Sequence, residues 1–468
     1  MNTPAQDRKP ESHDNRPICR IGLISPCLGN LGNAAILSSM IANIRERMPD
    51  AEIVGITLSP EDTRRRHGIE AFPITRIFRK NYSLPFSSAD RVQGRSAGKL
   101  RPAWLSIKEW LKRVPLLRPL VRGIRSFATE IIDIVQTERF VRGLQRVIVT
   151  GGGALDEFWG GPWGHPWTLF KFAVLSRLCH VPFLFVSVGK CSVERPLSRF
   201  FVRSALRMAE YRSYRDADSK TAVQALLRSP DDPVCADLAY CFPCQVARRP
   251  QSRSLQDQSL LVGVSPMAWC DPRVWPIKDE QRYSRYLGHL ADMVAWLLQQ
   301  RNRVLLFATD NPDNDNIADL QRLLSLRSVD SSLLQVIPGP PQQTTEGFLQ
   351  AISATDLVIA SRLHGVILSH LIAVPVLAIS YDRKVDAHMH DIGQSAYCLD
   401  IDHLDAESLV SRFVALRDAR ARESARIASA VQRYREQVRM QYDQLFGAAE
   451  HISPAPASDR QLITAAEP

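Results

Sequence analysis

The sequence of 468 residues has no apolar run long enough to cross a membrane. Its longest apolar stretches, such as Val181 to Val188, have the length of a buried strand and fall far short of the roughly 18 residues that a membrane helix needs. The first residues are polar and contain proline, without the apolar core of a secretory signal. Nine cysteines, an odd number, are scattered along the chain, so we expect free thiols in a reducing compartment. We therefore expect a cytoplasmic protein.

Common signatures of nucleotide, hydrolase and metal chemistry are also missing. The turn at Gly29 to Asn33 does not match G-x-G-x-x-G, and no Walker loop with its lysine is present. The sequence contains neither G-x-S-x-G nor H-E-x-x-H. Cys241 and Cys244 form a lone CxxC that nothing completes to four ligands, so we expect no metal. We predict a polar surface loop for the segment that holds His388 and His390.

What the sequence does have is the composition of a folded protein and one local concentration of positive charge. Hydrophobic residues make up 45% of the chain and charged residues 23%, which excludes disorder, collagen and coiled coil. Lys and Arg outnumber Asp and Glu by 59 to 49, and between Ala71 and Arg146 the count is 16 to 5. A basic insert at about 71–146 therefore accounts for the surplus. Such an insert attracts phosphates of nucleic acid, anionic lipid or a substrate.

The basic insert mixes large apolar side chains with Lys and Arg. Within 91–127, the stretch from Trp104 to Phe127 has the pattern of a helix that can lie on an anionic membrane. The alternative is a set of basic helices packed on the domain with their charges in water. No helix-turn-helix or zinc-finger spacing supports nucleic acid as a partner, and we expect none.

The chain alternates between strand and helix patterns in two series. After a disordered tail at 1–17, the segment from Ile21 to Leu58 shows strand, glycine-rich turn, helix and strand, which is a βαβ unit. A polar linker at 247–259 separates it from a second series of short β-branched strands and helices. The sequence therefore predicts an α/β fold of two Rossmann-like, doubly wound parallel-sheet domains that face one another across a cleft.

The predicted boundaries follow from the same patterns. The N-terminal domain spans 18–246 and contains the basic insert, and the C-terminal domain spans 260–404. A long charged helical segment at 405–447 could cross back to brace the first domain. We expect 448–468 to form a mobile tail.

The strongest candidate site follows the strand from Asp356 to Ala360. Ligands of open α/β sheets bind beyond the carboxyl ends of strands, where helices begin. Arg362 and His364 stand there, two residues apart, at the start of an apolar helix. Arg362 can neutralise a phosphate or carboxylate, and His364 can deliver a proton beside it. A lone buried histidine is more often structural, but the neighbouring arginine favours a functional pair.

Two glycine-rich segments add possible walls to the cleft. Asn30 and Asn33 flank glycines before a helix, where they bind a ligand or where Asn33 simply caps the helix. Gly152 and Gly153 directly follow a strand, as a flexible turn or as backbone that a substrate can touch. Asp156 and three tryptophans nearby favour substrate contact, because aromatic rings beside carboxylates suit sugars. The tryptophans are Trp159, Trp163 and Trp167.

Three further strand ends carry polar side chains. Arg215 is either a bidentate anion ligand or the structural partner of Asp216. Tyr381 and Lys384 follow the next strand after the Arg-x-His segment. Either Lys384 adds a second cation to the pocket, or both residues lie in a surface turn. Asp310 ends another strand and binds a hydroxyl group or caps the next helix.

Taken in order, these segments resemble the polysaccharide pyruvyl transferase family. The resemblance covers most of Ile21 to about Asp402, without the basic insert. It rests on GNLGNAAI, VIVTGGGALDE, YRSYRDADS and above all ASRLHGVILSHLIAVPVLAISYDRKV. It implies an architecture similar to GT-B glycosyltransferases and transfer of the pyruvyl group of phosphoenolpyruvate to a saccharide. The product would be a cyclic ketal, made in exopolysaccharide or cell-surface polysaccharide biosynthesis.

The resemblance also implies roles for individual residues. Phosphoenolpyruvate is the donor substrate, and no cofactor is required. Arg362, Arg215 and Lys384 would hold the trianionic donor, and His364 would protonate its methylene carbon.

The chain departs from the family pattern at Asn33. The family usually shows Gly-Asn-x-Gly-Asp at this turn, and an asparagine cannot act as a general base. Asp156 or Glu157 would then deprotonate the acceptor hydroxyl, or the enzyme is inactive or altered.

Two other functions stay open at this point. One is a GT-B-like nucleotide-sugar glycosyltransferase, and the other is a non-catalytic saccharide-binding member of the assembly machinery, which Asn33 makes plausible. The basic insert suits a peripheral protein that acts on lipid-linked saccharides at the inner face of a membrane.

Overall fold

The computed structural model describes residues 19–26, 29–74, 117–157, 160–190, 193–227, 231–246, 259–327 and 329–448. The tail predicted at 1–17 and most of the linker predicted at 247–259 lie outside these residues. The same holds for 75–116 of the basic insert and for all but the first residue of the tail predicted at 448–468.

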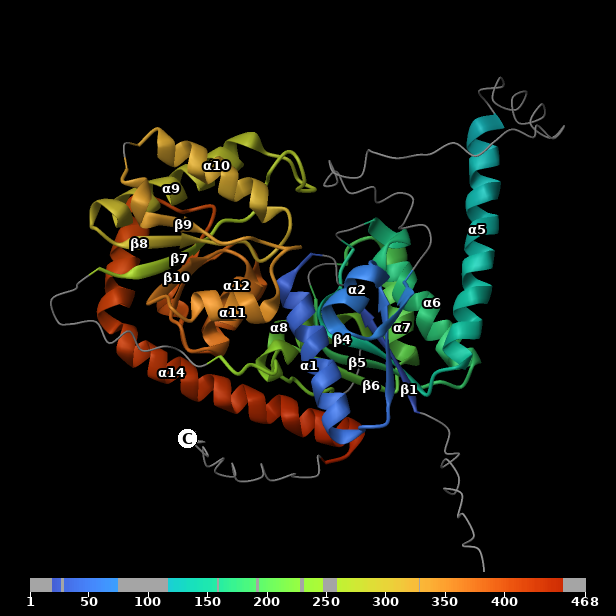
Figure 1. The fold of residues 1–468 in the computed structure, drawn as a ribbon. Coiled ribbons are helices and arrows are strands. Elements are labelled where there is room, and N and C mark those ends of the chain that lie inside the picture. Colours follow the sequence, from blue (N-terminus) through green and yellow to red (C-terminus); the bar gives the residue numbers. More distant parts are fainter. Residues whose placement is uncertain are drawn as a thin grey trace, which may run out of the picture.

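Two six-stranded parallel sheets form the core of the described chain (Figure 1). The N-terminal sheet contains β1 (Arg20–Ser25), β2 (Glu52–Thr57), β3 (Glu70–Pro73), β4 (Arg146–Leu155), β5 (Phe183–Lys190) and β6 (Tyr211–Tyr214). The C-terminal sheet contains β7 (Leu261–Ser265), β8 (Arg303–Leu306), β9 (Leu334–Val336), β10 (Leu357–Ala360), β11 (Val376–Ser380) and β12 (Cys398–Asp400). The orders are β3-β2-β1-β4-β5-β6 and β9-β8-β7-β10-β11-β12. Each sheet thus has the Rossmann order 3-2-1-4-5-6, which confirms the predicted fold class.

Helices connect the strands and cover the sheets. The N-terminal domain contains α1 (Leu31–Arg47), α2 (Pro60–His67), α5 (Leu117–Arg142), α6 (His165–Leu178), α7 (Pro196–Met208) and α8 (Ala217–Leu227). The C-terminal part contains α9 (Glu280–Gln299), α10 (Asp313–Ser325), α11 (Thr345–Ile352), α12 (Leu363–Leu371), α13 (Arg383–Asp391) and α14 (Ala406–Phe446). None of the helices in the described residues is long and apolar enough to span a bilayer.

The long helix α14 runs beneath both domains (Figure 1). Near its middle, Ser424 Oγ donates to the carbonyl of Ala373 in the C-terminal domain at 2.7 Å. Near its end, Asp443 accepts from Arg47 Nε of α1 at 2.8 Å. The helix is therefore hydrogen-bonded to both domains.

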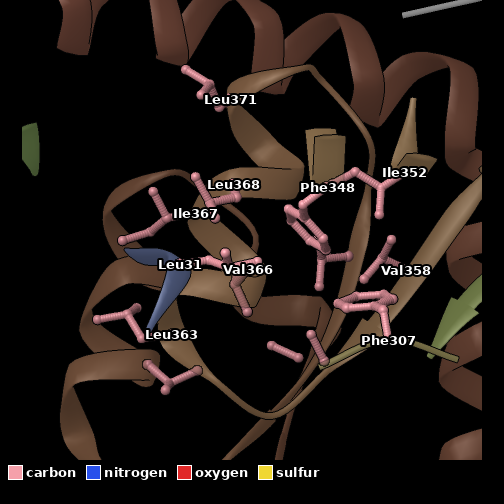
Figure 2. Close-up of a cluster of buried hydrophobic side chains, with 14 of the residues drawn as sticks. Leu31, Phe307, Phe348, Ile352, Val358, Leu363, Val366, Ile367, Leu368 and Leu371 are labelled. Carbon is pink, nitrogen blue, oxygen red and sulfur yellow. The ribbon is translucent and has the colours of Figure 1, made fainter. Parts of the chain in front are cut away.

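The first helix, α1, lies between the two domains. Eleven of its 17 residues are buried, which is typical of a helix with neighbours on several sides. Its first residue, Leu31, lies in the apolar core of the C-terminal domain, beside Leu363 and Val366 of α12 (Figure 2). The N-terminal domain thus inserts one side chain into the core of the other, which fixes the start of α1 against α12.

Backbone hydrogen bonds join the loop after β1 to the loop that follows β8. Leu31 N donates to Thr309 O, and Asn311 N donates to Gly29 O, both at 2.9 Å. Gly29 has a φ of +60°, a left-handed conformation that glycine adopts without steric cost. The carboxyl edges of the two sheets are therefore held face to face, and the candidate site residues meet there.

Candidate active site

Three ionisable side chains from both domains meet between the sheets. Arg215 follows β6, Asp237 caps the short 3₁₀ helix Leu238–Cys241, and His364 lies in the first turn of α12. Arg215 Nη1 donates to Asp237 Oδ2 at 3.4 Å, and His364 Nε2 lies 3.6 Å from the same oxygen. The side chain of Asp237 is 2% exposed and that of His364 is 14% exposed. Sequence reasoning predicted Arg215 and His364 but missed the carboxylate that joins them.

The carboxylate of Asp237 is an anion at the bottom of this cluster. Burial alone would raise its pKa, but His364, Arg215 and the N–H of Ala239 outweigh burial and hold the pKa well below the usual range. Among the described residues, no group lies within hydrogen-bond distance of the buried Nε2 of His364. A nitrogen that makes no hydrogen bond to these residues and lies beside a buried anion is suited to exchange a proton with a ligand.

His364 lies directly against the backbone of α1. A Cβ atom placed on Gly32 would come within 2.0 Å of His364 Cγ, closer than any side chain tolerates. Glycine at this position therefore makes room for a histidine of the opposite domain. The glycines of the Gly-Asn-Leu-Gly-Asn segment had suggested contact with a ligand, and at Gly32 the group in contact is His364.

Arg362 is bound by two carboxylates of its own domain. Its Nη2 donates to Asp313 Oδ1 at 2.7 Å and its Nε to Asp313 Oδ2 at 3.0 Å, while Nη1 lies 3.3 Å from Asp310 Oδ2. Burial lowers the pKa of Arg362, but the two aspartates outweigh it and raise that pKa. Its positive charge is balanced before any ligand arrives, which the sequence did not indicate. The alternative that Asp310 caps the next helix is wrong, because the N-cap of α10 is Pro312.

The structure corrects the predicted roles of the asparagines and glycines. Asn30 is the N-cap of α1, since its Oδ1 accepts from the N–H of Asn33 at 3.0 Å, so Asn33 is not the cap. Gly152 and Gly153 lie within β4, which continues to Leu155, and do not follow it. Gly152 has a φ of +69°, and a Cβ there would lie 3.3 Å from Asn33 Oδ1. Asn33 and Gly152 therefore face one another, while Gly153 is exposed.

Most of the aromatic segment after β4 serves the packing of helices. Glu157 accepts from the backbone N–H groups of Glu194 and Arg195 at 2.8 and 3.1 Å and also from Ser198, so both its oxygens are engaged before α7. Because both oxygens are engaged, a general-base role for Glu157 does not fit. Trp163 and Trp167 pack on Phe201 of α7, and Trp159 lies outside the described residues. Asp156 is half-buried and interacts electrostatically with His165.

Tyr381 and Lys384 form a small aromatic and cationic cluster beside Arg362. The ring of Tyr381 meets that of Trp275 edge-on, with centroids 6.0 Å apart, and Lys384 Nζ lies 4.9 Å from the centroid of Tyr381. Tyr381 also contributes to the raised pKa of Arg362. Neither residue is fully exposed, so the alternative of a solvated surface turn does not describe them.

His388 is a residue of the site that sequence reasoning misplaced. It lies in α13 and not in a loop, with Nε2 3.2 Å from His370 Nδ1 and 3.4 Å from the hydroxyl of Tyr240. Burial lowers the pKa of His388 to about 4, with Asp237 raising it and Arg215 and His364 lowering it. Val385 and Met389 are buried on the same helix, and this spacing was the available signal. His390 is exposed, as predicted for a surface position.

No group of three or more His, Cys, Asp or Glu side chains in the described residues is arranged to hold a metal ion. The thiols of Cys241 and Cys244 instead lie against the backbone carbonyls of Arg435 and Val246. The described site therefore consists of arginines, histidines, carboxylates and a lysine at the edges of two parallel sheets. This set can bind an anion and move a proton.

Solved structures with the same arrangement of two domains show the fold. The S. aureus MnaA–UDP complex matches with a TM-score of 0.52 at 10% identity, covering 92% of this chain and 98% of that one. The UDP-GlcNAc 2-epimerase of Neisseria meningitidis bound to UDP-GlcNAc gives 0.51 at 11%, covering 91% and 99%. Anabaena HepE in complex with UDP gives 0.50 at 12%, covering 91% and 98%. The architecture is thus similar to GT-B.

The family follows from the sequence match and not from these distant structures. No curated protein matches the chain. The profile of the polysaccharide pyruvyl transferase family matches residues 30–383, from the N-cap of α1 to the start of α13. This range includes Arg215, Asp237, Arg362 and His364. The chain is a transferase that belongs to the polysaccharide pyruvyl transferase family.

Proposed function

We propose that the chain transfers the pyruvyl group of phosphoenolpyruvate to a saccharide and forms a cyclic ketal. The observation that carries this proposal is the buried Nε2 of His364, which has no hydrogen-bond partner among the described residues and lies 3.6 Å from Asp237. Acid catalysis on an enol phosphate needs a proton donor that is sheltered from water and supported by a nearby anion. His364 and Asp237 meet this requirement.

The reaction has two additions to the same carbon. One sugar hydroxyl adds to C2 of the enolpyruvate while His364 gives its proton to C3, which becomes the methyl group. Phosphate then leaves C2, and a second hydroxyl of the sugar adds there and closes the ketal. The two hydroxyl groups release two protons: one replaces, through the base and solvent, the proton that His364 gave to C3, and the other leaves with the phosphate, so no redox step or cofactor is needed.

The donor carries a phosphate and a carboxylate, and its charge must be matched. Arg215 and Arg362 already contact four carboxylates of the protein, those of Asp216, Asp237, Asp310 and Asp313. We therefore assign the phosphate to Lys384 and to the N–H groups at the N-terminus of α12, where the helix dipole favours an anion. In this assignment the arginines orient the carboxylate of the donor and hold the aspartates in place.

The acceptor hydroxyl needs a base, and Asn33 cannot supply one. Asp156 remains the candidate, because it is a half-buried carboxylate at the end of β4. We propose that the acceptor saccharide lies along β4, between Asn33 and the exposed backbone at Gly153, with the enzyme acting in the cytoplasm. Asn33 then binds a sugar hydroxyl through its amide.

The test is acceptor-dependent release of phosphate from phosphoenolpyruvate, measured with a panel of nitrophenyl and lipid-linked glycosides. We expect His364→Asn to lower kcat by about 10²- to 10⁴-fold, the usual contribution of a general acid. The matched control is His390→Asn, because His390 is exposed on α13 and should leave the rate unchanged. Binding of a uridine diphosphate sugar without any phosphate release would favour a glycosyltransferase. If the wild type showed no turnover, and both the wild type and His364→Asn bound saccharide, a non-catalytic binding protein would be favoured.

A further inference from the structure

Large apolar side chains are exposed on three helical elements that pack on α6 of the N-terminal domain. Six of the twelve such side chains in the described residues lie on α5, on α7 and on the short 3₁₀ helix Gly161–Trp163 before α6. They are Ile131, Ile132, Val135, Trp163, Leu197 and Phe200. We call this set the α5–α7 face. Trp163 is 65% exposed and Phe200 is 56% exposed, although both are large rings. Such a concentration marks a surface that meets a partner.

The exposed rings rest on a rigid aromatic base. The ring of Trp163 lies 5.7 Å from those of Trp167 and Phe201, and Phe200 lies 5.8 Å from Phe170. Trp167 is fixed in turn by its Nε1, which donates to Glu130 of α5 at 2.7 Å. The helices therefore present Trp163 and Phe200 to solvent from a packed layer, so their exposure does not come from a loose segment.

The charge of α7 has one sign. Helix α7 contains Arg199, Arg203 and Arg207 and no acidic residue. Phe200 and Arg207 are both exposed and stand seven residues apart, which places them on the same side of the helix. Helix α5 carries five arginines and three acidic residues, and the acidic groups have partners within the protein: Glu130 with Trp167, Asp133 with Lys171 and Glu138 with Arg142. Exposed apolar groups and arginines therefore occur together on α7.

We infer that the α5–α7 face docks on the surface of an anionic lipid bilayer. Tryptophan and phenylalanine insert at the level of the headgroups, while arginines on the same helix contact lipid phosphates. A second copy of the chain is disfavoured as the occupant, because a two-fold interface on α7 would bring its arginines against each other. This inference does not depend on the chemistry proposed for His364.

The position of the face is compatible with access to the site. Helix α5 stands on the side of the N-terminal domain that is far from the C-terminal domain (Figure 1). The cluster around His364 lies between the two sheets. Docking through α5 and α7 therefore leaves the edges of the sheets free for a soluble donor, while an acceptor anchored in the same bilayer stays nearby.

Co-sedimentation of the full chain with vesicles tests the inference. The probes are vesicles of phosphatidylcholine alone and vesicles of phosphatidylcholine mixed with phosphatidylglycerol. We expect binding to the anionic vesicles only, with a loss of about tenfold or more in the partition coefficient for Trp163→Ala/Phe200→Ala. The Arg199→Gln/Arg207→Gln variant should also bind the anionic vesicles more weakly, and its binding should depend less on the salt concentration than that of the wild type.

Two matched control variants replace exposed apolar and exposed arginine side chains that lie outside the α5–α7 face. Leu326 and Met440 are 80% and 70% exposed, and Arg412 and Arg433 are exposed on α14. Leu326→Ala/Met440→Ala and Arg412→Gln/Arg433→Gln should bind vesicles like the wild type. Circular dichroism of every variant checks that the fold is kept.

Failure of the wild type to bind anionic vesicles would overturn the inference, as would unchanged binding by Trp163→Ala/Phe200→Ala. A dimer in light scattering that this double variant dissociates would assign the face to a second copy.

Discussion

The two domains share one strand order but use equivalent strand ends in opposite ways. In each sheet the fourth strand lies beside the first, β4 beside β1 and β10 beside β7, and ligands of Rossmann folds bind at this point. Strand β10 ends at Ala360 and is followed at once by Arg362 and His364, whereas β4 runs on through three glycines to Leu155. At these two strand ends the C-terminal domain thus supplies reactive side chains, whereas the N-terminal domain supplies glycine backbone.

This division makes each domain incomplete without the other. His364 belongs to the C-terminal domain, yet Gly32 gives it room and Asp237 places a carboxylate 3.6 Å from its Nε2, and both lie in the N-terminal domain. Arg362 takes its two aspartates from its own domain. The arginine is therefore held locally and the histidine is held between domains, which predicts different responses to substitution.

The largest expected effect on stability is at the local partner of Arg362. Asp313→Ala leaves a buried guanidinium with one carboxylate fewer, and removal of one partner of a buried pair costs about 3–5 kcal/mol. Urea unfolding should show this loss. Asp315→Ala is the matched control, because Asp315 is exposed in the same turn of α10 and should change the free energy of unfolding little. Equal, small losses in both variants would show that the ion pair does not fix the start of α10.

The second effect tests the contact between domains. Gly32→Ala places a methyl group on the ring of His364, and we expect a cost of about 1–3 kcal/mol in unfolding together with a fall in kcat. Gly288→Ala in α9 should have the opposite sign, since nothing lies within 4 Å of its Cβ position and alanine favours a helix by about 1 kcal/mol. If Gly32→Ala changed the free energy of unfolding no more than Gly288→Ala, the close contact of His364 with Gly32 of α1 would be contradicted.

The smallest effect concerns His388 and pH. Its pKa is lowered to about 4 from 6.5, so the unfolded chain binds a proton between these values and the folded chain does not. Stability is therefore complete above pH 6.5 and decreases as the pH falls towards 4, by about 1–2 kcal/mol at pH 5. Burial lowers the pKa of His370 as well, in the same direction. In urea unfolding at pH 7 and pH 5, His388→Gln should lose less stability than the wild type and the exposed control His390→Gln. If the free energy of unfolding of His388→Gln fell between pH 7 and pH 5 as much as that of the wild type, His388 would not be a buried neutral group.

Much of this architecture could be predicted from the sequence, because its pattern reports on burial. Runs such as Leu357–Ala360 are apolar throughout because both faces of the sheet are covered, and this alone indicates parallel sheets. Arg362 and His364 could be found because they follow such a run directly. Glycines after Thr150 were less informative, since a sequence does not say whether a strand stops at a glycine or bends through it.

The residues that were missed depend on contacts between distant segments. Asp237 lies 127 residues before His364 in a stretch without any motif, and no local pattern shows that they meet. The pairing of Arg362 with Asp313 was equally invisible, although Asp313 lies in the first turn of a predicted helix. The loop predicted around His388 is a helix, and the spacing of Val385 and Met389, which are buried on it, is the local signal that indicates this.

The most direct test of the account follows the proton that His364 delivers. The chain is incubated in D₂O with phosphoenolpyruvate and an acceptor glycoside identified by phosphate release, and the product is read by mass spectrometry and NMR. We predict a saccharide heavier by one pyruvyl ketal, with one deuterium in its methyl group, for the wild type and His390→Asn, and almost none for His364→Asn. An equal yield from His364→Asn, or phosphate release without a ketal on the sugar, would contradict the assignment of proton transfer to His364.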